Sequence, residues 1–320
     1  MSQEEDHCWQ TIQQIDNPWS SWYEKKSQTS TFSKLQMSNN SPKRDDESTR
    51  RSYPLSEEDK RRQTIVKENQ EFISQNQSLV PPNGETIYDK DHNNIQRQIS
   101  GRSGGRTCQI FVNSHSTIWS AIYCHNLHFK TIYVLNFANA FKPGGGYLNG
   151  RRAQEETLCR QTLLYPSLAN NEMYSFNSQF GREGSDVMIY SPNVLVIRDD
   201  NEFELLPEYE RFYINVITSA AVDNSIEKVE NCEEIMERRI RKIISLAAFK
   251  AMEDGGGGKV ALILGAFGCG VYKNDPKVVS SIFAKILFDE KMESFFDCVI
   301  FPIYRDNDEK KQIFQDILSK

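Results

Sequence analysis

The segment 144–156, GGGYLNGRRAQEE, combines residue types that can hold a ligand with residue types that can act on it. Three glycines follow an apolar run, and consecutive glycines let the backbone approach a ligand and adopt positive φ at little steric cost. Glu155 and Glu156 lie beside this loop, where carboxyl groups can donate and accept protons. The pattern predicts an enzyme that works on a molecule held by the loop.

A second glycine loop, GAFGCGVY at 265–272, follows another apolar run and precedes a proline at the start of a predicted helix. Loop amides ahead of a helix N-terminus can bind an anion. The spacing differs from both GxxxxGK[ST] and a GxGxxG that opens a helix. A diphosphate-binding loop and a tight structural turn therefore remain alternatives, and the first glycine loop favours the diphosphate.

The two adjacent glutamates cannot share one role, because neighbouring helical residues point about 100° apart. One carboxyl group is expected to face the reaction and the other to orient the substrate. Burial and like charge raise a carboxyl pKa, whereas a helix N-terminus lowers it. A general acid needs the first two effects to dominate. The alternative is an exposed helix start, which also favours acids, but the neighbouring glycines support catalysis.

Other candidate groups have simpler explanations when taken alone. Asn139 could bind a sugar hydroxyl, but an Asx-turn at the strand end is favoured. Nearby amides could lower the pKa of the Cys269 thiol, but a small residue that fits the turn is the better explanation. The histidines do not pair with a Ser or Cys motif, and no GxSxG is present, which disfavours a Ser–His–Asp hydrolase.

Strands and helices alternate along the chain from residue 56, which predicts a three-layer α/β/α domain. Both glycine loops follow predicted strands, and ligands in such folds bind at the carboxyl ends of strands. Residues 80–106 have a loop-like composition. The predicted helices are 56–75, with Ser56 as N-cap, 116–126, 154–168, 230–253, 276–292, with Asp275 as N-cap, and 308–319, and the predicted strands are 109–113, 131–138, 188–199, 213–221, 259–267 and 297–304.

The bulk properties of the 320-residue chain narrow its class. Its net charge of −6 gives no general attraction to nucleic acid or anionic membranes. The apolar runs are too short to span a bilayer, and the acidic, polar start MSQEEDHCWQ leads us to expect no secretory signal. Seven scattered cysteines without a CxxC pair indicate neither a zinc site nor a disulfide framework. We expect a monomer in the cytoplasm or nucleus.

Residues 1–54 form a tail rich in Ser, Gln, Asn, Lys and Asp, which predicts disorder or a strap. Trp9, Trp19, Trp22 and Tyr23 are either a strap on the folded domain, which is slightly favoured, or a docking motif for a partner. The basic clusters at 43–44, 50–51 and 60–62 are either a nuclear import signal or, with acids interspersed, a solvated surface. The second explanation is favoured.

Four segments together resemble the microbial-type poly(ADP-ribose) glycohydrolases, over about residue 58 to the C-terminus. They are NFANAFKPGGGYLNGRRAQEETLCRQTLLYP, SPNVLVIRD, ITSAAVDN and LILGAFGCGVYKNDP. The glycine triplet followed eight residues later by QEE is specific to that family. The resemblance implies a macrodomain-like α/β/α fold with a mixed sheet, and a catalytic domain at 55–320 whose N-terminal helical extension covers about 55–106.

The resemblance also implies roles for individual residues. Glu156 would be the catalytic acid, Glu155 would hold ribose hydroxyls, and Asn139 would contact the distal ribose. Tyr272 would pack on the terminal ribose. The remaining implied substrate-binding residues lie in or beside the two glycine loops: Gly144, Gly145, Gly146, Gln154, Gly265, Gly268, Cys269, Gly270 and Val271.

The activity implied is hydrolysis of the ribose–ribose O-glycosidic bond, from the chain terminus, to release ADP-ribose. Such a bond breaks through an oxocarbenium-like transition state, with a carboxylic acid protonating the leaving oxygen. No metal or cofactor is expected. The expected partners are ADP-ribose polymer or ADP-ribosylated proteins, without sequence-specific nucleic-acid or membrane binding. The alternatives are a mono-ADP-ribosyl-protein hydrolase, a non-catalytic ADP-ribose reader, and an unrelated phosphate-binding enzyme.

Overall fold

The structure is a computed structural model that describes residues 56–254, 257–304 and 308–319. The predicted tail at 1–54, with its tryptophans and two of the basic clusters, lies outside the described residues. The third cluster, 60–62, lies on the first described helix, where Lys60, Arg61 and Arg62 each pair with an acid. This pairing agrees with the expected charged surface.

A seven-stranded mixed sheet forms the centre of the described residues, in the order β1-β4-β5-β3-β6-β7-β2. Strands β5, β3, β6, β7 and β2 run parallel, and β4 and β1 are antiparallel to their neighbours. The central strands are mostly apolar and buried, so both faces of the sheet must be covered. The bounds are β1 Glu85–Ile87, β2 Gln109–Asn113, β3 Thr131–Phe137, β4 Met188–Val196, β5 Phe212–Ser219, β6 Val260–Ile263 and β7 Cys298–Pro302.

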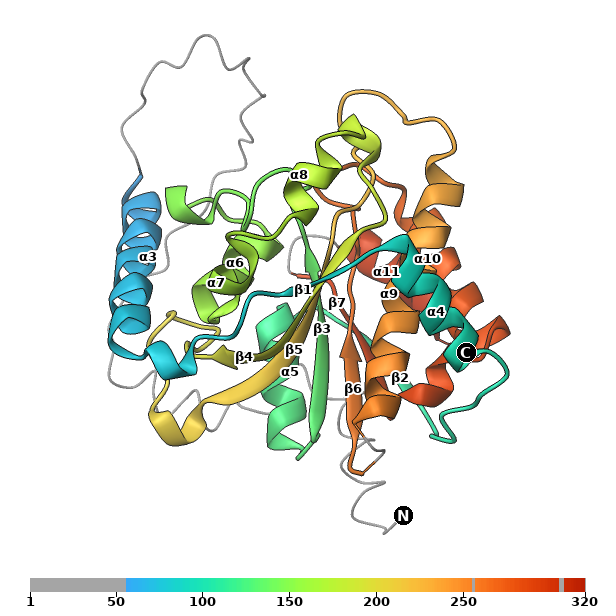
Figure 1. Cartoon of the computed structure of the whole chain (residues 1–320), viewed down its shortest axis with the longest axis horizontal. Coiled ribbons are helices and arrows are strands. Elements are labelled where there is room, and N and C mark those ends of the chain that lie inside the picture. The colour runs from blue at the N-terminus through green and yellow to red at the C-terminus, as the bar shows by residue number, and fades with distance from the viewer. Residues whose placement is uncertain (1–55, 255–256, 305–307, 320) are drawn as a thin grey trace. The chain divides into compact units, whose positions relative to one another are not determined.

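Helices cover both faces of this sheet (Figure 1). One layer contains α5 (Thr117–Asn126), α6 (Gln154–Gln161) and α7 (Leu164–Leu168), and the other contains α4 (Asp89–Ile99), α9 (Cys232–Glu253), α10 (Pro276–Ala284) and α11 (Asp308–Leu318). A short helix, α8, spans Met173–Asn177. The predicted three-layer fold with a mixed sheet is confirmed.

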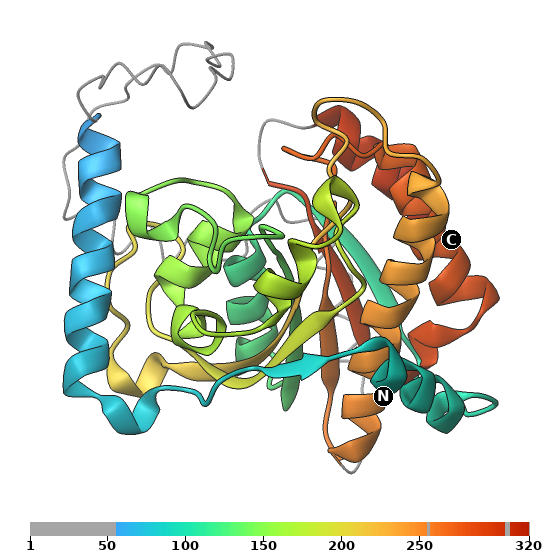
Figure 2. The same ribbon diagram turned by 45° about the horizontal axis from the view of Figure 1, so that its top comes forward.

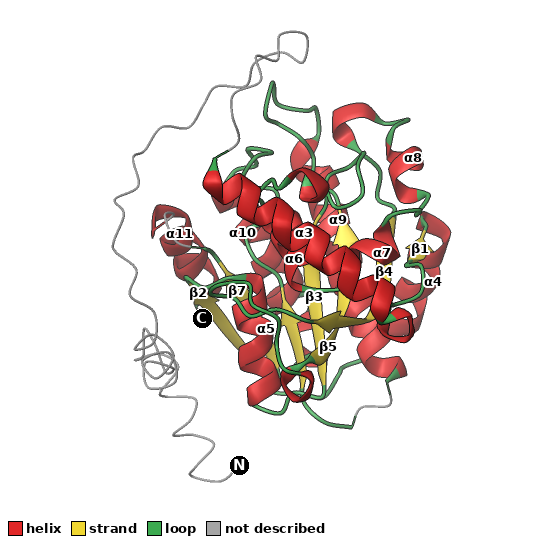
Figure 3. Ribbon diagram, turned by 90° about the vertical axis from the view of Figure 1, so that its left-hand side faces the viewer, coloured by secondary structure: helices red, strands yellow, loops and turns green. Residues whose placement is uncertain are grey.

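The N-terminal helix α3 (Glu57–Gln75) lies outside the three layers and packs over α6 (Figures 2 and 3). Its predicted N-cap is confirmed, because the Ser56 hydroxyl accepts the Asp59 amide at 3.1 Å. The Asp59 carboxylate accepts the Ser56 amide in return, which completes a capping box. The sequence predicted a helical extension over about 55–106. Helix α3 lies in that range, but β1 and α4 of the same range belong to the sheet and to one of the helix layers.

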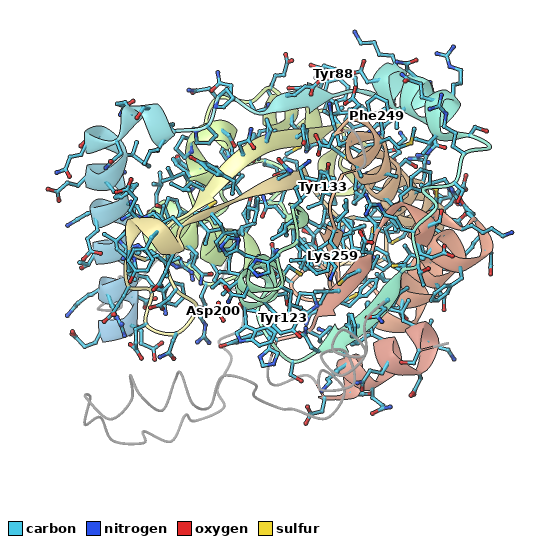
Figure 4. All side chains as sticks on the ribbon, turned by 90° about the horizontal axis from the view of Figure 1, so that it is seen from below. Tyr88, Tyr123, Tyr133, Asp200, Phe249 and Lys259 are labelled. Carbon is cyan, nitrogen blue, oxygen red and sulfur yellow. The ribbon has the colours of Figure 1, made fainter. Side chains whose placement is uncertain are left out.

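The main apolar core lies between the sheet and the α4, α9, α10 and α11 layer. Figure 4 shows Tyr133 of β3 in the interior, where the side chain is fully buried. Its hydroxyl donates to Asp254 Oδ2 at 2.8 Å, so the buried oxygen is satisfied at the end of α9. The two long central elements, β3 and α9, are thereby fixed to each other.

The prediction of a loop over 80–106 is wrong, because this segment contains β1 and α4. The turn-forming residues lie at its two ends: Pro81, Pro82 and Gly84 precede β1, and Gly101, Gly104 and Gly105 follow α4. In α4, His92, Ile95 and Ile99 form a buried stripe at helical spacing within an otherwise polar sequence. Averaging composition over the whole segment concealed that short stripe.

The single helix predicted over 154–168 is also wrong, because the chain breaks between α6 and α7. Thr162 adopts an extended conformation and forms an isolated bridge with Val196 of β4. Pro166 has no N–H to donate to the Thr162 carbonyl, so a continuous helix would lose that bond. The break directs α7 onto β4 and leaves α6 beside β3.

Most other predicted boundaries differ by one to three residues, and two differ by more. The strand predicted over 259–267 ends as β6 at Ile263, because Gly265 has a φ of +117° and turns the chain. The helix predicted over 276–292 begins as expected, with Asp275 capping the Lys277 amide at 2.8 Å. It ends as α10 at Ala284 and continues as a π-helix over Lys285–Asp289.

Candidate active site

The two glycine loops lie at one edge of the sheet, because β3 and β6 are adjacent and parallel. The first loop follows the end of β3 at Phe137, and the second follows the end of β6 at Ile263. Gly265 packs against Phe137, whose ring carbon Cζ lies 3.0 Å from the position of a Cβ on that glycine. The sequence prediction that both loops sit at carboxyl ends of strands is confirmed.

Glu156 is held by amides from both sides of the loop that surrounds it. Its Oε1 accepts the Gly146 amide at 2.8 Å, and its Oε2 accepts the Ala153 amide at 2.8 Å. The side chain is at the third position of α6 and is largely buried. Each carboxyl oxygen keeps one further lone pair, so the group can still exchange a proton with a bound molecule.

Gly145 closes the site by lying directly against both glutamates. With a φ of +56°, it adopts a left-handed conformation that favours glycine. A Cβ on this residue would lie 2.6 Å from Glu156 Oε1 and 3.0 Å from Glu155 Oε2. The glycine is therefore required both for the turn and for the close approach of the two carboxyl groups.

Glu155 lies deeper than Glu156, with 2% of its surface exposed. Its Oε2 accepts the Asn139 amide at 2.7 Å, and its Oε1 accepts Asn136 Nδ2 at 3.3 Å. Burial raises the pKa of Glu155 to about 8, against the lowering effect of the hydrogen bonds from Asn139 and Asn136. The dominance of burial, which the sequence reasoning required of the general acid, thus occurs at Glu155, the glutamate expected to hold the ribose hydroxyls.

Gln154 fixes the start of α6 to the end of β3. Its Oε1 accepts the Phe137 amide at 2.9 Å, and its Nε2 donates to the Leu135 carbonyl at 2.8 Å and to Thr117 Oγ1 at 3.3 Å. Every proton of the amide group is used within the protein. The residue positions both glutamates, and its direct contact with substrate stays a prediction.

Asn139 forms the Asx-turn that its position suggested. Its Oδ1 accepts the amides of Phe141 and Lys142, both at 2.9 Å. Its Nδ2 donates to no atom within the described part of the chain, and the side chain is half-buried beside Glu155. A free amide donor beside a buried carboxyl group is compatible with the ribose contact that the family resemblance implies.

The second glycine loop is built around the buried side chain of Asn274. Its Nδ2 donates to the Val222 carbonyl at 2.8 Å and to the Gly268 carbonyl at 3.1 Å, and its Oδ1 accepts Asn224 Nδ2 at 3.1 Å. Gly268, with a φ of +73°, leaves only 2.6 Å between its Cβ position and Ala221. The loop is thereby fixed to the segment that follows β5.

The outer part of this loop is open. No atom lies within 4 Å of a Cβ placed on Gly270, Val271 is exposed, and Tyr272 is half-buried. Cys269, in contrast, is buried, and burial raises the pKa of its thiol to about 12. The idea that loop amides lower this pKa is therefore wrong, and Cys269 is a small residue that fits the turn.

Sequence reasoning missed two buried asparagines, Asn69 and Asn136, that support the first glycine loop and the two glutamates. Asn69 of α3 is buried, and its Nδ2 donates to the Arg160 carbonyl at 2.8 Å and to the Tyr147 hydroxyl at 3.3 Å. Asn136 of β3 was detectable, because it is a polar residue within a buried apolar strand. Asn69 carries no such signal, since its partners are distant in the sequence.

The described residues, 56–254, 257–304 and 308–319, contain no group of three or more His, Cys, Asp and Glu side chains arranged for a metal ion. Across the same residues, no helix is both long enough and apolar enough to cross a membrane.

Comparison with known proteins identifies the same region. Residues 49–199 match the family described as "Microbial-type PARG, catalytic domain". The structure resembles poly(ADP-ribose) glycohydrolase from Thermomonospora curvata, with 27% identity, a TM-score of 0.70, and coverage of 81% of this chain and 99% of that chain. Comparison with curated proteins gives no match.

Two solved complexes extend the comparison. The Deinococcus radiodurans poly(ADP-ribose) glycohydrolase in complex with ADP-ribose is 28% identical, with a TM-score of 0.64 and coverage of 73% of this chain and 93% of that chain. The Thermomonospora curvata enzyme bound to the inhibitor ADP-HPD is 27% identical, with a TM-score of 0.65 and coverage of 80% and 99%. Over residues 49–199 the sequence is thus similar to the microbial-type poly(ADP-ribose) glycohydrolase catalytic domain, and the fold is similar to those of the bacterial enzymes.

Proposed function

We propose that this protein hydrolyses the ribose–ribose O-glycosidic bond of poly(ADP-ribose), with Glu156 as general acid and base. The observation that carries the proposal is the Glu156 carboxyl group, held between the Gly146 and Ala153 amides at 2.8 Å each, beside the first glycine loop. The relatives are named as glycohydrolases of this polymer, and one of them is in complex with ADP-ribose.

In the proposed reaction, Glu156 gives its proton to the 2′-oxygen of the leaving ribose as the bond between that oxygen and the anomeric carbon breaks. The anomeric carbon acquires oxocarbenium character in the transition state. Glu156, now a carboxylate, takes a proton from the attacking water, whose oxygen bonds to the anomeric carbon. The net reaction adds one water across the bond and returns Glu156 to its starting state.

The other groups would hold the terminal ADP-ribose unit. Glu155 and the free amide of Asn139 would bind ribose hydroxyls, and the two glycine loops would bracket the diphosphate. Gly270 supports this assignment, because its open surroundings leave the loop backbone accessible. We propose that Tyr272 packs on the terminal ribose and that the enzyme therefore acts from the chain end.

We further propose that residues 55–320 form the catalytic unit and that it works as a monomer in the cytoplasm or nucleus. The net charge of −6 supports recognition of the polymer by local groups and not by the overall field. Sequence-specific binding to nucleic acid is not expected on the same ground. Size-exclusion chromatography with light scattering tests the monomer.

The test is release of ADP-ribose from purified poly(ADP-ribose) by the full chain and by Glu156→Gln. We expect release by the wild type and a rate roughly 10²–10⁴-fold lower for the variant, since general acid catalysis contributes that much. Turnover by the variant at the wild-type rate would refute the role of Glu156. A wild type that binds ADP-ribose without turnover would indicate a reader or a mono-ADP-ribosyl hydrolase.

A further inference from the structure

Three basic side chains surround the loop that holds Glu156. Lys142 precedes the glycine triplet, and Arg151 and Arg152 follow it. All three are exposed, and none pairs with a carboxylate anywhere in the described ranges. The neighbouring acids of α3 do not neutralise them, because Glu57, Glu58 and Asp59 pair with Lys60 and Arg62 of the same helix.

Arg151 is built into the catalytic loop. Its amide donates to the Gly146 carbonyl at 3.1 Å, and its carbonyl accepts Arg160 Nη1 at 2.6 Å. Its Cβ lies 2.6 Å from the position of a Cβ on Gly146. The Gly146 amide donates to Glu156 Oε1. Gly146 therefore contacts both the Arg151 side chain and the Glu156 carboxyl group.

Arg160 gives this arrangement its rigidity. The side chain is 1% exposed and makes no ion pair within the part of the chain that the structure describes. It donates instead to the Arg151 carbonyl and to Thr157 Oγ1, at 2.6 and 3.2 Å. The backbone before α6 is therefore fixed from within, while the Arg151 and Arg152 side chains remain at the surface.

On the opposite arm, the Lys142 backbone is equally fixed. Its amide donates to Asn139 Oδ1, and its carbonyl accepts the Gly145 amide, both at 2.9 Å. The three cations thus stand on both arms of a rigid loop around the carboxyl group that faces the scissile bond. The leaving group of that bond is the next ADP-ribose unit, which carries a diphosphate.

We propose that Lys142, Arg151 and Arg152 form a second subsite that binds the diphosphate of the ADP-ribose unit on the leaving-group side. Arginine suits this task, because its planar guanidinium donates two parallel hydrogen bonds to phosphate oxygens. The overall charge of the chain is negative, so such a subsite is the means by which polymer is held more tightly than free ADP-ribose. This inference rests on the proposed function.

The test measures binding, so that it does not depend on turnover. In the full chain carrying Glu156→Gln, affinities for free ADP-ribose and for poly(ADP-ribose) of defined length are compared. Adding R151Q and R152Q is expected to lower the ratio of polymer to ADP-ribose affinity about tenfold, which corresponds to roughly 1.4 kcal/mol. The salt dependence of polymer binding should become weaker as well.

A matched control is R97Q with R102Q, which removes the same charge from two exposed arginines at α4 and the segment after it. This control should leave the affinity ratio unchanged. K142Q serves as an independent variant on the other arm and should lower the ratio further. The thermal midpoint of each variant verifies that it is folded.

The proposal would be refuted if adding R151Q and R152Q to the Glu156→Gln protein left the ratio of polymer to ADP-ribose affinity unchanged. An equal loss in the R97Q and R102Q control would overturn it too, because the effect would then come from net charge alone. So would a parent that binds polymer no more tightly than ADP-ribose. Failure of the proposed function is recognised separately, as absence of ADP-ribose release by the wild type.

Discussion

At the scale of single residues, Gly145 determines how closely the carboxyl groups of Glu155 and Glu156 approach the loop. A methyl group here would lie 2.6 Å from Glu156 Oε1, far inside normal contact distance, and would face strain at a φ of +56°. We expect Gly145→Ala to lower kcat at least about a hundredfold, because a shift of about 1 Å in a catalytic group has that effect. Steady-state release of ADP-ribose measures it.

The matched control for this prediction is Gly181→Ala. Gly181 has the same φ of +56°, but no atom lies within 4 Å of its Cβ position. Both variants therefore carry the backbone strain of about 1 kcal/mol, and only Gly145→Ala displaces the carboxyl groups. Equal activity losses in the two would show that strain, and not displacement of the glutamates, is responsible.

At the scale of elements, α3 supports the first glycine loop through a buried network. Asn69 links the Tyr147 hydroxyl and the Arg160 carbonyl, and its Oδ1 accepts Arg198 Nε at 2.8 Å. Arg62 adds a hydrogen bond to the Gly150 carbonyl at 2.7 Å. The extension outside the three layers thus contacts the loop that carries the glycines and the helix that carries the glutamates.

We expect Asn69→Ala to destabilise the protein by about 3 kcal/mol, because three buried polar groups lose a partner. We also expect kcat to fall more than KM rises, since the loop around Glu156 loses support from α3. Denaturant unfolding and steady-state kinetics measure the two effects. Gln70→Ala, at the next and exposed position of α3, should change neither. If the Asn69→Ala protein folds and its kcat is unchanged, the predicted effect of α3 on the loop around Glu156 is wrong and the role of α3 is structural only.

The elements that the sequence predicted correctly are those whose signal is local. β3 is a continuous apolar run, α9 has a long apolar stripe, and α3 and α10 begin at recognisable caps. The two glycine loops and both glutamates were found for the same reason, since their residues lie within short segments.

The features that sequence reasoning missed depend on distant partners. The break at Thr162 follows from its pairing with Val196, and the role of Asn69 follows from contacts with Tyr147 and Arg198. A pattern of neighbouring residues in the sequence does not indicate contacts between residues that are far apart along the chain. The two arginines after the glycine triplet were visible in the sequence, but their lack of acidic partners became apparent only once the neighbouring side chains were placed.

At the scale of the whole molecule, two buried groups give the free energy of unfolding opposite pH dependences. Burial raises the pKa of Glu155 to about 8 from an ordinary value of 4.5. Between these values the folded state binds more protons than the unfolded state. The contribution of Glu155 to the free energy of unfolding is therefore fully present below pH 4.5 and is lost as the pH rises towards 8.

His92 acts in the opposite direction from the other layer of helices. It is 1% exposed, and neither ring nitrogen has a hydrogen-bond partner among the described residues. Burial, with a smaller effect of Lys242, lowers its pKa from 6.5 to about 4. The unfolded state binds more protons between these values, so stability is lost as the pH falls from 6.5 to 4.

These signs predict how two variants differ from the wild type. The stability of Glu155→Gln relative to the wild type should rise with pH between 4.5 and 8, and that of His92→Phe should rise as the pH falls from 6.5 to 4. The limiting slope is about 1.4 kcal/mol per pH unit for each group.

Urea unfolding across pH 4–9 measures the free energy of unfolding of both variants and the wild type. The slope of the difference against pH separates titration from any constant cost of the substitution. Gln70→Ala, which changes no titratable group at an exposed position of α3, should run parallel to the wild type. Curves for Glu155→Gln or His92→Phe that also run parallel would show that the group does not titrate differently in the folded and unfolded states.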